Sequence, residues 1–106
     1  MRGRLGLHNV LIDVMGTRGQ KPTRVYFQPP ESVKLSYPAI VYSRTTIGST
    51  FADNEVYMQS HGYQITVIDE DPDSEIVKKV SRLPTCRFDR HFTADNLNHD
   101  VFKIYY

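Results

Sequence analysis

A run of alternating residues between His61 and Asp69 constrains the fold of this 106-residue chain more than any other feature. Tyr63, Ile65 and Val67 point to one side of the run, and polar residues stand between them. This period of two predicts a β-strand with one buried face. Such a strand needs partner strands and a layer that covers its apolar face, so we expect a sheet packed against other elements.

Four further strands are predicted from short runs rich in β-branched and aromatic residues. The runs lie at residues 24–28, 37–43, 85–92 and 101–106. The run at 37–43 is apolar on both faces, which favours a place near the sheet centre or at a contact between subunits. In the run at 85–92, alternation predicts one face with Cys86, Phe88 and Phe92, and an opposite face with Arg87, Asp89 and His91.

Two amphipathic helices are also predicted. The first is expected over residues 5–15, where apolar residues recur at helical spacing, and Gly16 ends it. The second follows Asp71, which suits an N-cap, and Pro72, which suits the first helical position; it ends at Pro84. The apolar stripes are Leu7, Val10, Leu11 and Val14 in the first helix, and Ile76, Val77, Val80 and Leu83 in the second.

These elements follow the order α-β-β-β-α-β-β, with no internal repeat and no linker, and we expect a single domain over residues 1–106. The predicted class is α+β: a mainly antiparallel sheet of about five strands with two helices packed on one face. Residues 44–60 show no firm period and are expected to form a long hairpin loop between the second and third strands. The connection through the second helix is either a β-α-β crossover or an antiparallel return, and the sequence leaves both open.

The composition argues against several classes of protein. A net charge of +1 fits neither a strongly basic nucleic-acid binder nor a disordered acidic tail. The only cysteine, Cys86, rules out an intramolecular disulfide. No run approaches the roughly 20 apolar residues of a membrane-spanning helix, so no membrane partner is expected, and no apolar signal-peptide core follows the first residues.

One hairpin gathers residue types that could carry chemistry. Residues 89–100 hold His91 and His99, which a hairpin could place on neighbouring strands, together with three carboxylates. Zinc or a non-haem metal would use such ligands, so a small metal-dependent hydrolase using Asp89, His91, Asp95 and His99 is the enzyme alternative. The spacing matches no known metal motif, and turns are rich in Asp and Asn for local backbone bonding. We therefore expect a solvated turn.

Three other groups have both a functional and a structural interpretation. Cys86 with His91 could form a nucleophile and its base, but the alternation places them on opposite faces, so we expect a buried thiol. The carboxylates at 69–73 could bind Ca²⁺, but they lack the spacing of an EF-hand loop. A basic group could meet phosphates or be a solvated face, and it consists of Arg2, Arg4, Arg18, Lys21 and Arg24. We expect no catalytic residue, no metal and no cofactor.

Four segments carry a resemblance to known proteins. They read FQPPES at 27–32, YPAIVY at 37–42, YQITVIDEDPDS at 63–74 and CRFDRHFTADNLNHD at 86–100. Together they resemble small minor tail or neck proteins of long-tailed bacteriophages and prophages. The order of elements, with a long loop between the second and third strands, resembles the tail terminator (head–tail joining) proteins among them.

This resemblance implies a structural, non-enzymatic virion protein of the tail or neck, assembled in the host cytoplasm. Tail terminators form a hexameric ring at the head-proximal end of the tail, which ends tail-tube polymerisation and joins the tail to the head. The implied partners are further copies of the chain, the tail tube protein, and a head-completion (stopper) or connector protein. DNA passes through the lumen without specific binding. Another neck component, such as a head-completion protein, is the alternative within this class.

A ring requires contacts between two different patches of each subunit. The expected hairpin loop from Arg44 to Ser60 is the candidate for one patch, because its apolar residues show no burial pattern of their own. The residues assigned to a subunit or tail-tube interface are Arg44, Ile47, Phe51, Val56 and Tyr57. In the alternative, Phe51 and Tyr57 fold onto the core of their own subunit.

Overall fold

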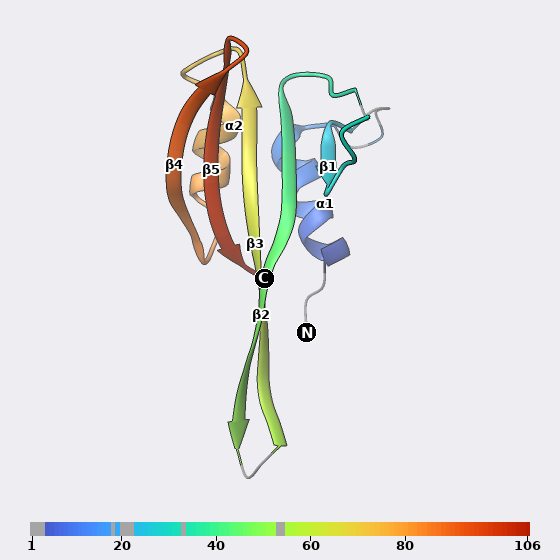
Figure 1. Ribbon diagram of the computed structural model, residues 1–106, viewed down its shortest axis with the longest axis vertical. Coiled ribbons are helices and arrows are strands. Elements are labelled where there is room, and N and C mark those ends of the chain that lie inside the picture. Colours follow the sequence, from blue (N-terminus) through green and yellow to red (C-terminus); the bar gives the residue numbers. More distant parts are fainter. Residues whose placement is uncertain (1–3, 18, 20–22, 33, 53–54) are drawn as a thin grey trace.

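The computed structural model describes residues 4–17, 19, 23–32, 34–52 and 55–106, with side chains outside that description at 46–52 and 55–61 (Figure 1). The predicted α-β-β-β-α-β-β order is confirmed. The elements are α1 (Arg4–Met15), β1 (Val25–Phe27), β2 (Ala39–Ala52), β3 (Glu55–Asp69), α2 (Glu75–Ser81), β4 (Cys86–Ala94) and β5 (Leu97–Tyr105). None of the described helices is long and apolar enough to cross a membrane.

The five strands form one mixed sheet in the order β1-β2-β3-β5-β4. Only the pairing of β1 with β2 is parallel, and the other three pairings are antiparallel. Since β5 lies between β3 and β4 and is antiparallel to both, β3 and β4 run in the same direction. The connection through α2 is therefore a β-α-β crossover, which settles the alternative that the sequence left open.

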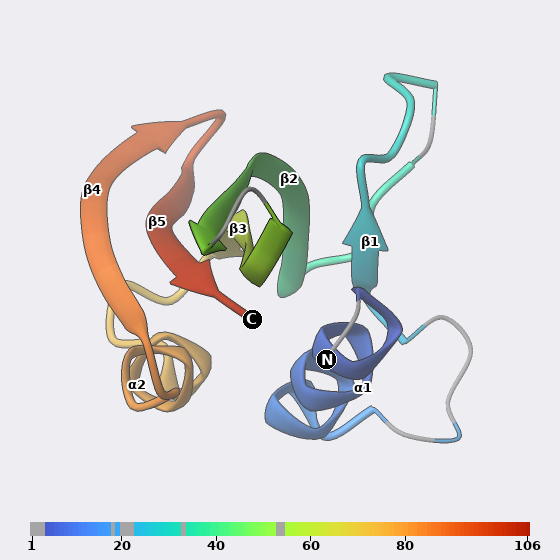
Figure 2. The same cartoon turned by 90° about the horizontal axis from the view of Figure 1, so that it is seen from below.

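Both helices cover the same face of the sheet, as predicted (Figure 2). The apolar stripe of α1 places Leu7 and Leu11 in the core without exposure, and Val80 does the same from α2. The sheet side of this core consists of Val25, Ile40, Tyr42, Tyr63, Ile65, Val67, Phe102 and Ile104. We call this side the helical face and the other side the open face.

The end of α1 follows from a single glycine. Gly16 has a φ of +72°, and its amide donates to the Ile12 carbonyl at 3.0 Å, while the next amide, of Thr17, reaches the same carbonyl at 3.3 Å. A residue with a Cβ adopts this left-handed conformation only at a cost, so glycine is the natural residue here.

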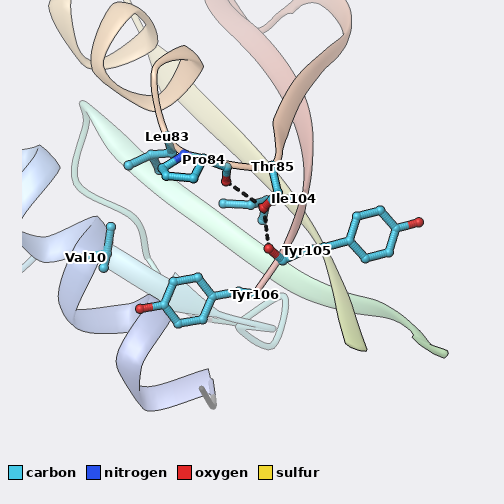
Figure 3. Close-up of a pocket in the computed structure, with 7 residues that line it drawn as sticks. All are labelled: Val10, Leu83, Pro84, Thr85, Ile104, Tyr105 and Tyr106. Carbon is cyan, nitrogen blue, oxygen red and sulfur yellow. Dashed lines mark hydrogen bonds between the residues drawn. The ribbon is translucent and has the colours of Figure 1, made fainter. Parts of the chain in front are cut away.

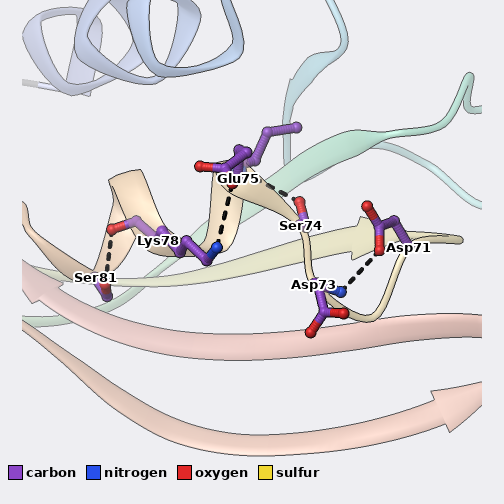
Figure 4. Close-up of polar contacts among 7 residues, drawn as sticks. Asp71, Asp73, Ser74, Glu75, Lys78 and Ser81 are labelled. Atoms are coloured by element: carbon purple, nitrogen blue, oxygen red, sulfur yellow. Dashed lines mark hydrogen bonds and ion pairs between the residues drawn. The ribbon is translucent and has the colours of Figure 1, made fainter.

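The start of α2 differs from the prediction. The N-cap is Ser74, whose hydroxyl accepts a hydrogen bond from the Ile76 amide at 3.2 Å (Figure 4). Asp71, predicted as the cap, lies one turn earlier and accepts from the Asp73 amide at 2.9 Å. Asp69 makes the same kind of bond at 3.0 Å to the Asp71 amide. Aspartates compete for such local turn bonds, and here the turn delays the helix by three residues.

A tight hairpin joins β4 to β5. Asp95 and Asn96 occupy its two loop positions, with φ values of 53° and 63°. Positive φ at both positions is the geometry of a type I′ turn, whose twist matches that of paired strands. The turn predicted near residues 93–96 is thus confirmed.

A β-bulge in β4 overturns part of the predicted facing. The register shifts between Phe88 and Arg90, and the extra residue, Asp89, reverses the alternation for the rest of the strand. Phe92, predicted to share a face with Cys86, therefore lies on the open face, whereas Cys86 packs against the core on the helical face. His91, predicted opposite Cys86, lies on the same helical face, because its partner Asp100 pairs with the core residue Val67.

The predicted loop at 44–60 is instead regular structure. β2 continues to Ala52 and β3 begins at Glu55, and the two strands pair along this length with irregularities near Thr45 and Tyr57. The hairpin was predicted, but its loop character was wrong. Backbone pairing between the two arms makes them strands, although their sequence shows no firm period of two.

The cap assignment generates a stability prediction. Ser74→Ala is expected to lower the free energy of unfolding by about 1 kcal/mol, because the Ile76 amide loses its acceptor. Ser81→Ala, at the exposed other end of α2, is the matched control and should change it by less than about 0.5 kcal/mol. Urea denaturation measures both. Equal effects of the two substitutions would contradict the cap at Ser74.

Candidate subunit interface

The outer halves of β2 and β3 form a ribbon that leaves the sheet (Figure 1). β5 accompanies β3 only from Asp69 to Gly62, and β1 accompanies β2 only from Ile40 to Tyr42. Beyond these positions the ribbon, comprising residues 46–52 and 55–61, has no further strand on either side within the described chain. Seven residues of strand span about 23 Å, and the longest extent of the molecule is 51 Å.

Such a ribbon has little stability of its own in an isolated molecule. A two-stranded hairpin in water is marginally stable at best, and its two edges present unpaired backbone donors and acceptors. The ribbon is therefore the part of this chain that most needs a partner.

The root of the ribbon is fixed on the helical face by an aromatic cluster. The ring centroids of Phe27 and Tyr42 lie 5.0 Å apart, and those of Tyr42 and Tyr63 lie 6.3 Å apart. The guanidinium carbon of Arg4 stands 4.6 Å from the centroid of the Phe27 ring. Contacts of this kind tie α1, β1, β2 and β3 together where the ribbon begins.

A hydrogen bond reinforces the same root. His8 Nδ1 and the Tyr42 hydroxyl lie 2.6 Å apart. Burial, together with the nearby charge of Arg4, lowers the pKa of His8, and burial raises the pKa of Tyr42. The lowered pKa of His8 and the raised pKa of Tyr42 both favour the neutral side chains, so the contact is a hydrogen bond between two uncharged groups.

The five residues assigned to an interface lie on the two strands of the hairpin. Arg44 is exposed at the root, where its amide donates to Gln28 Oε1 at 3.2 Å and its guanidinium carbon stands 5.9 Å from the Tyr63 ring centroid. The other four lie within the ribbon, where side chains are outside the described part: Ile47, Phe51, Val56 and Tyr57. Their assignment stays a prediction.

The open face of the sheet divides into two regions. Near the β4–β5 turn, an apolar groove of about 350 Å³ lies between the sheet and the connection from β1 to β2. Its lining includes Pro29, Leu35, Val41, Ile68, Phe92 and His99. Phe92 stacks on His99 with ring centroids 4.6 Å apart. At the other end, next to the ribbon, the open face is polar.

A second groove, of about 430 Å³, lies between α1 and the corner that joins α2 to β4 (Figure 3). Its lining includes Val10, Leu83, Pro84, Thr85, Ile104 and Tyr106. Tyr106 closes one side by packing on α1 so tightly that a Cβ at Gly6 would lie 3.2 Å from its ring. The Thr85 hydroxyl bonds the Tyr105 carbonyl and holds the corner against the end of β5.

The structure does not assemble the hydrolase residues into a site. His91 pairs with Asp100 at 2.8 Å, whereas His99 lies on the other face against Phe92. Among the described residues, no three His, Cys, Asp or Glu side chains gather as metal ligands would. The hydrolase hypothesis thus loses the convergence on which it depended.

The remaining candidates also have structural explanations. Cys86 is half-buried, and burial raises the pKa of its thiol, which disfavours the reactive thiolate. In the carboxylate run, Asp69 and Asp71 each bond a backbone amide. Of the basic group, Arg4 and Arg24 are half-buried, and the other members (Arg2, Arg18 and Lys21) lie outside the described residues.

Sequence reasoning missed the polar region of the open face beside the ribbon, where Arg87 lies opposite Lys103. The β4–β5 turn alone would place Arg87 opposite Ile104, and only the bulge at Asp89 brings the two cations together. Counting paired residues outward from the β4–β5 turn would have identified the Arg87–Lys103 pair only if the bulge had been recognised.

No protein-family model matches the chain, and no curated protein matches it.

Proposed function

We propose that this chain is a structural subunit of a bacteriophage tail, of the tail terminator kind, which assembles into a ring of six at the head-proximal end of the tail. The ring ends polymerisation of the tail tube and joins the tail to the head. The observation that carries the proposal is the β2–β3 ribbon, which leaves the sheet without a neighbouring strand.

The ribbon supports assembly because it is unfavourable in free energy for an isolated molecule, whereas a subunit of an assembly can bury it. Its exposed edges and the apolar residues in its sequence, including Ile47 and Phe51, gain free energy when another surface covers them. A contact between a projecting ribbon and the body of a neighbour joins two different patches, and such heterologous contacts close into rings.

The element order supports the same proposal. The resemblance to tail terminators rests on the α-β-β-β-α-β-β order, which the chain has, and on a long loop between the second and third strands, where the chain has the paired ribbon. The partners we propose are further copies of the chain, the tail tube protein, and a head-completion or connector protein. DNA crosses the lumen without specific binding, which a net charge of +1 supports. The subunit performs no catalysis and belongs to the virion.

The first test concerns copy number. Native mass measurement of purified necks or tails is expected to give six copies of this chain per particle, because the proposed ring has six subunits. Twelve copies would point to a connector, and any other number would remove the terminator role.

Particles that lack the chain separate termination from joining. Electron micrographs are expected to show tails of excessive and variable length, because nothing stops tube growth. Normal-length tails beside full, unjoined heads would assign the chain to a joining role alone.

The ribbon itself is tested by Phe51→Asp. In register, Phe51 pairs with Val56 near the end of the hairpin, far from the buried core. The isolated subunit is expected to keep its melting temperature within about 2 °C, while assembly into tails is lost because a charge replaces an apolar contact.

Leu5→Asp is the matched control, since Leu5 is 66% exposed on α1 and distant in sequence from the ribbon. It should leave both melting temperature and assembly unchanged. Unfolding of the isolated Phe51→Asp subunit would mean that this residue belongs to the core of its own chain, and the interface assignment would be wrong.

A further inference from the structure

The polar region of the open face forms a groove at the root of the ribbon. One part, of about 460 Å³, is lined by Thr85, Cys86, Arg87, Lys103 and Tyr105. A smaller part, of about 180 Å³, extends it across β3 to β2 and shares Lys103 and Tyr105 with the first. We call these two parts together the root groove. Tyr105 lines both parts and is 55% exposed.

Among the side chains that the structure describes, none forms an ion pair with the charges in the root groove. Arg87 and Lys103 lie directly opposite each other on β4 and β5, and Gln64 on β3 lies opposite Lys103 on its other side. Like charges in this position destabilise a sheet. Every described ion pair lies elsewhere: Lys78 with Glu75, Arg90 with Asp89, and His91 with Asp100. The described residues that line the two parts of the groove include no carboxylate side chain, so the groove is suited to an anionic partner.

The opposite end of the same sheet carries the complementary charge. The turn from Glu70 to Asp73 is exposed throughout. Glu70 and Asp73 have no cation among the described ion pairs, and only one oxygen of Asp71 is used within the turn. From Gly62, beside the root groove, to Asp69, beside this turn, β3 runs for about 23 Å. The sheet is therefore basic at the ribbon end and acidic at the other.

We propose that the root groove binds the acidic turn at residues 70–73 of a second copy of this chain. The two surfaces are different patches of one subunit, so the contact is heterologous and repeats around a ring. Docking at the root neutralises Arg87 and Lys103 with the carboxylates of the second copy. This contact rests on the ring assembly proposed above and names the surfaces that form it.

Charge reversal on either side tests the contact. Arg87→Glu with Lys103→Glu makes the groove acidic, and Glu70→Lys with Asp73→Lys makes the turn basic. Each double variant is expected to self-associate at least about tenfold more weakly than the unaltered chain in low salt, because like charges then meet at the contact. Sedimentation velocity measures the association, and thermal melting shows that each variant remains folded.

Mixing the two double variants gives the decisive result. Each supplies the surface that the other needs, so the equimolar mixture is expected to associate more tightly than either variant does alone. Lys34→Glu with Lys79→Glu is the matched control, with the same change in net charge at two exposed lysines away from the groove. It should associate like the unaltered chain.

Several outcomes would overturn the docking. They are a mixture that stays monomeric, a control that loses association equally, and an unaltered chain that does not self-associate in low salt. If the groove variant instead loses affinity for duplex DNA while self-association is unchanged, the groove is a nucleic-acid surface and the proposal fails. If the charge-reversed variants still assemble into rings of six, the docking is refuted and the terminator role stands. If association depends on these charges but the particles do not hold six copies, the docking stands and the terminator role is refuted.

Discussion

The antiparallel pairing of β2 with β3 is the interaction on which the rest of this structure depends. One half of the pair lies within the sheet, where Ile40 faces Val67 and Tyr42 faces Ile65 in the core. A slip of one residue would turn these side chains to the open face, so burial determines the register. The pairing continues into the ribbon after a one-residue shift between Arg44 and Thr46. The position of the projecting half is thus determined by side chains that lie within the sheet.

The two faces of the sheet differ in what covers them and in their polarity. The helical face is closed by α1 and α2 and contains the aromatic cluster at the ribbon root. The open face is apolar under the β1–β2 connection and polar beside the ribbon. Two features of β4 keep this edge strand from indiscriminate pairing: the bulge at Asp89 and its exposed charged residues. Natural proteins protect sheet edges in this way, which leaves specific contacts as the means of assembly.

Elements whose sequence period reflects burial could be predicted. The strand around Ile65, the stripe of α1 with Leu7 and Leu11, and the turn at Asp95–Asn96 were all identified from pattern and turn chemistry. Three features were missed because their causes are not periodic. Ser74 caps α2 because aspartates bond within the preceding turn, the bulge at Asp89 reverses the facing of Phe92, and the ribbon is strand because its two arms pair with each other. The cationic pair in the root groove depends on that same bulge.

The central position of β2 and β3 has a mechanical consequence. Tension applied along the ribbon would pull both strands lengthwise past β1 and β5, their neighbours in the sheet. Hydrogen bonds between strands lie across the strand direction, so such a load shears many of them at once instead of opening them one after another. Failure would require the core around Tyr42 and Phe102 to yield in the same event. The ribbon is therefore anchored at the centre of the sheet, and a pull along it loads the strand pairing in the direction in which that pairing resists best.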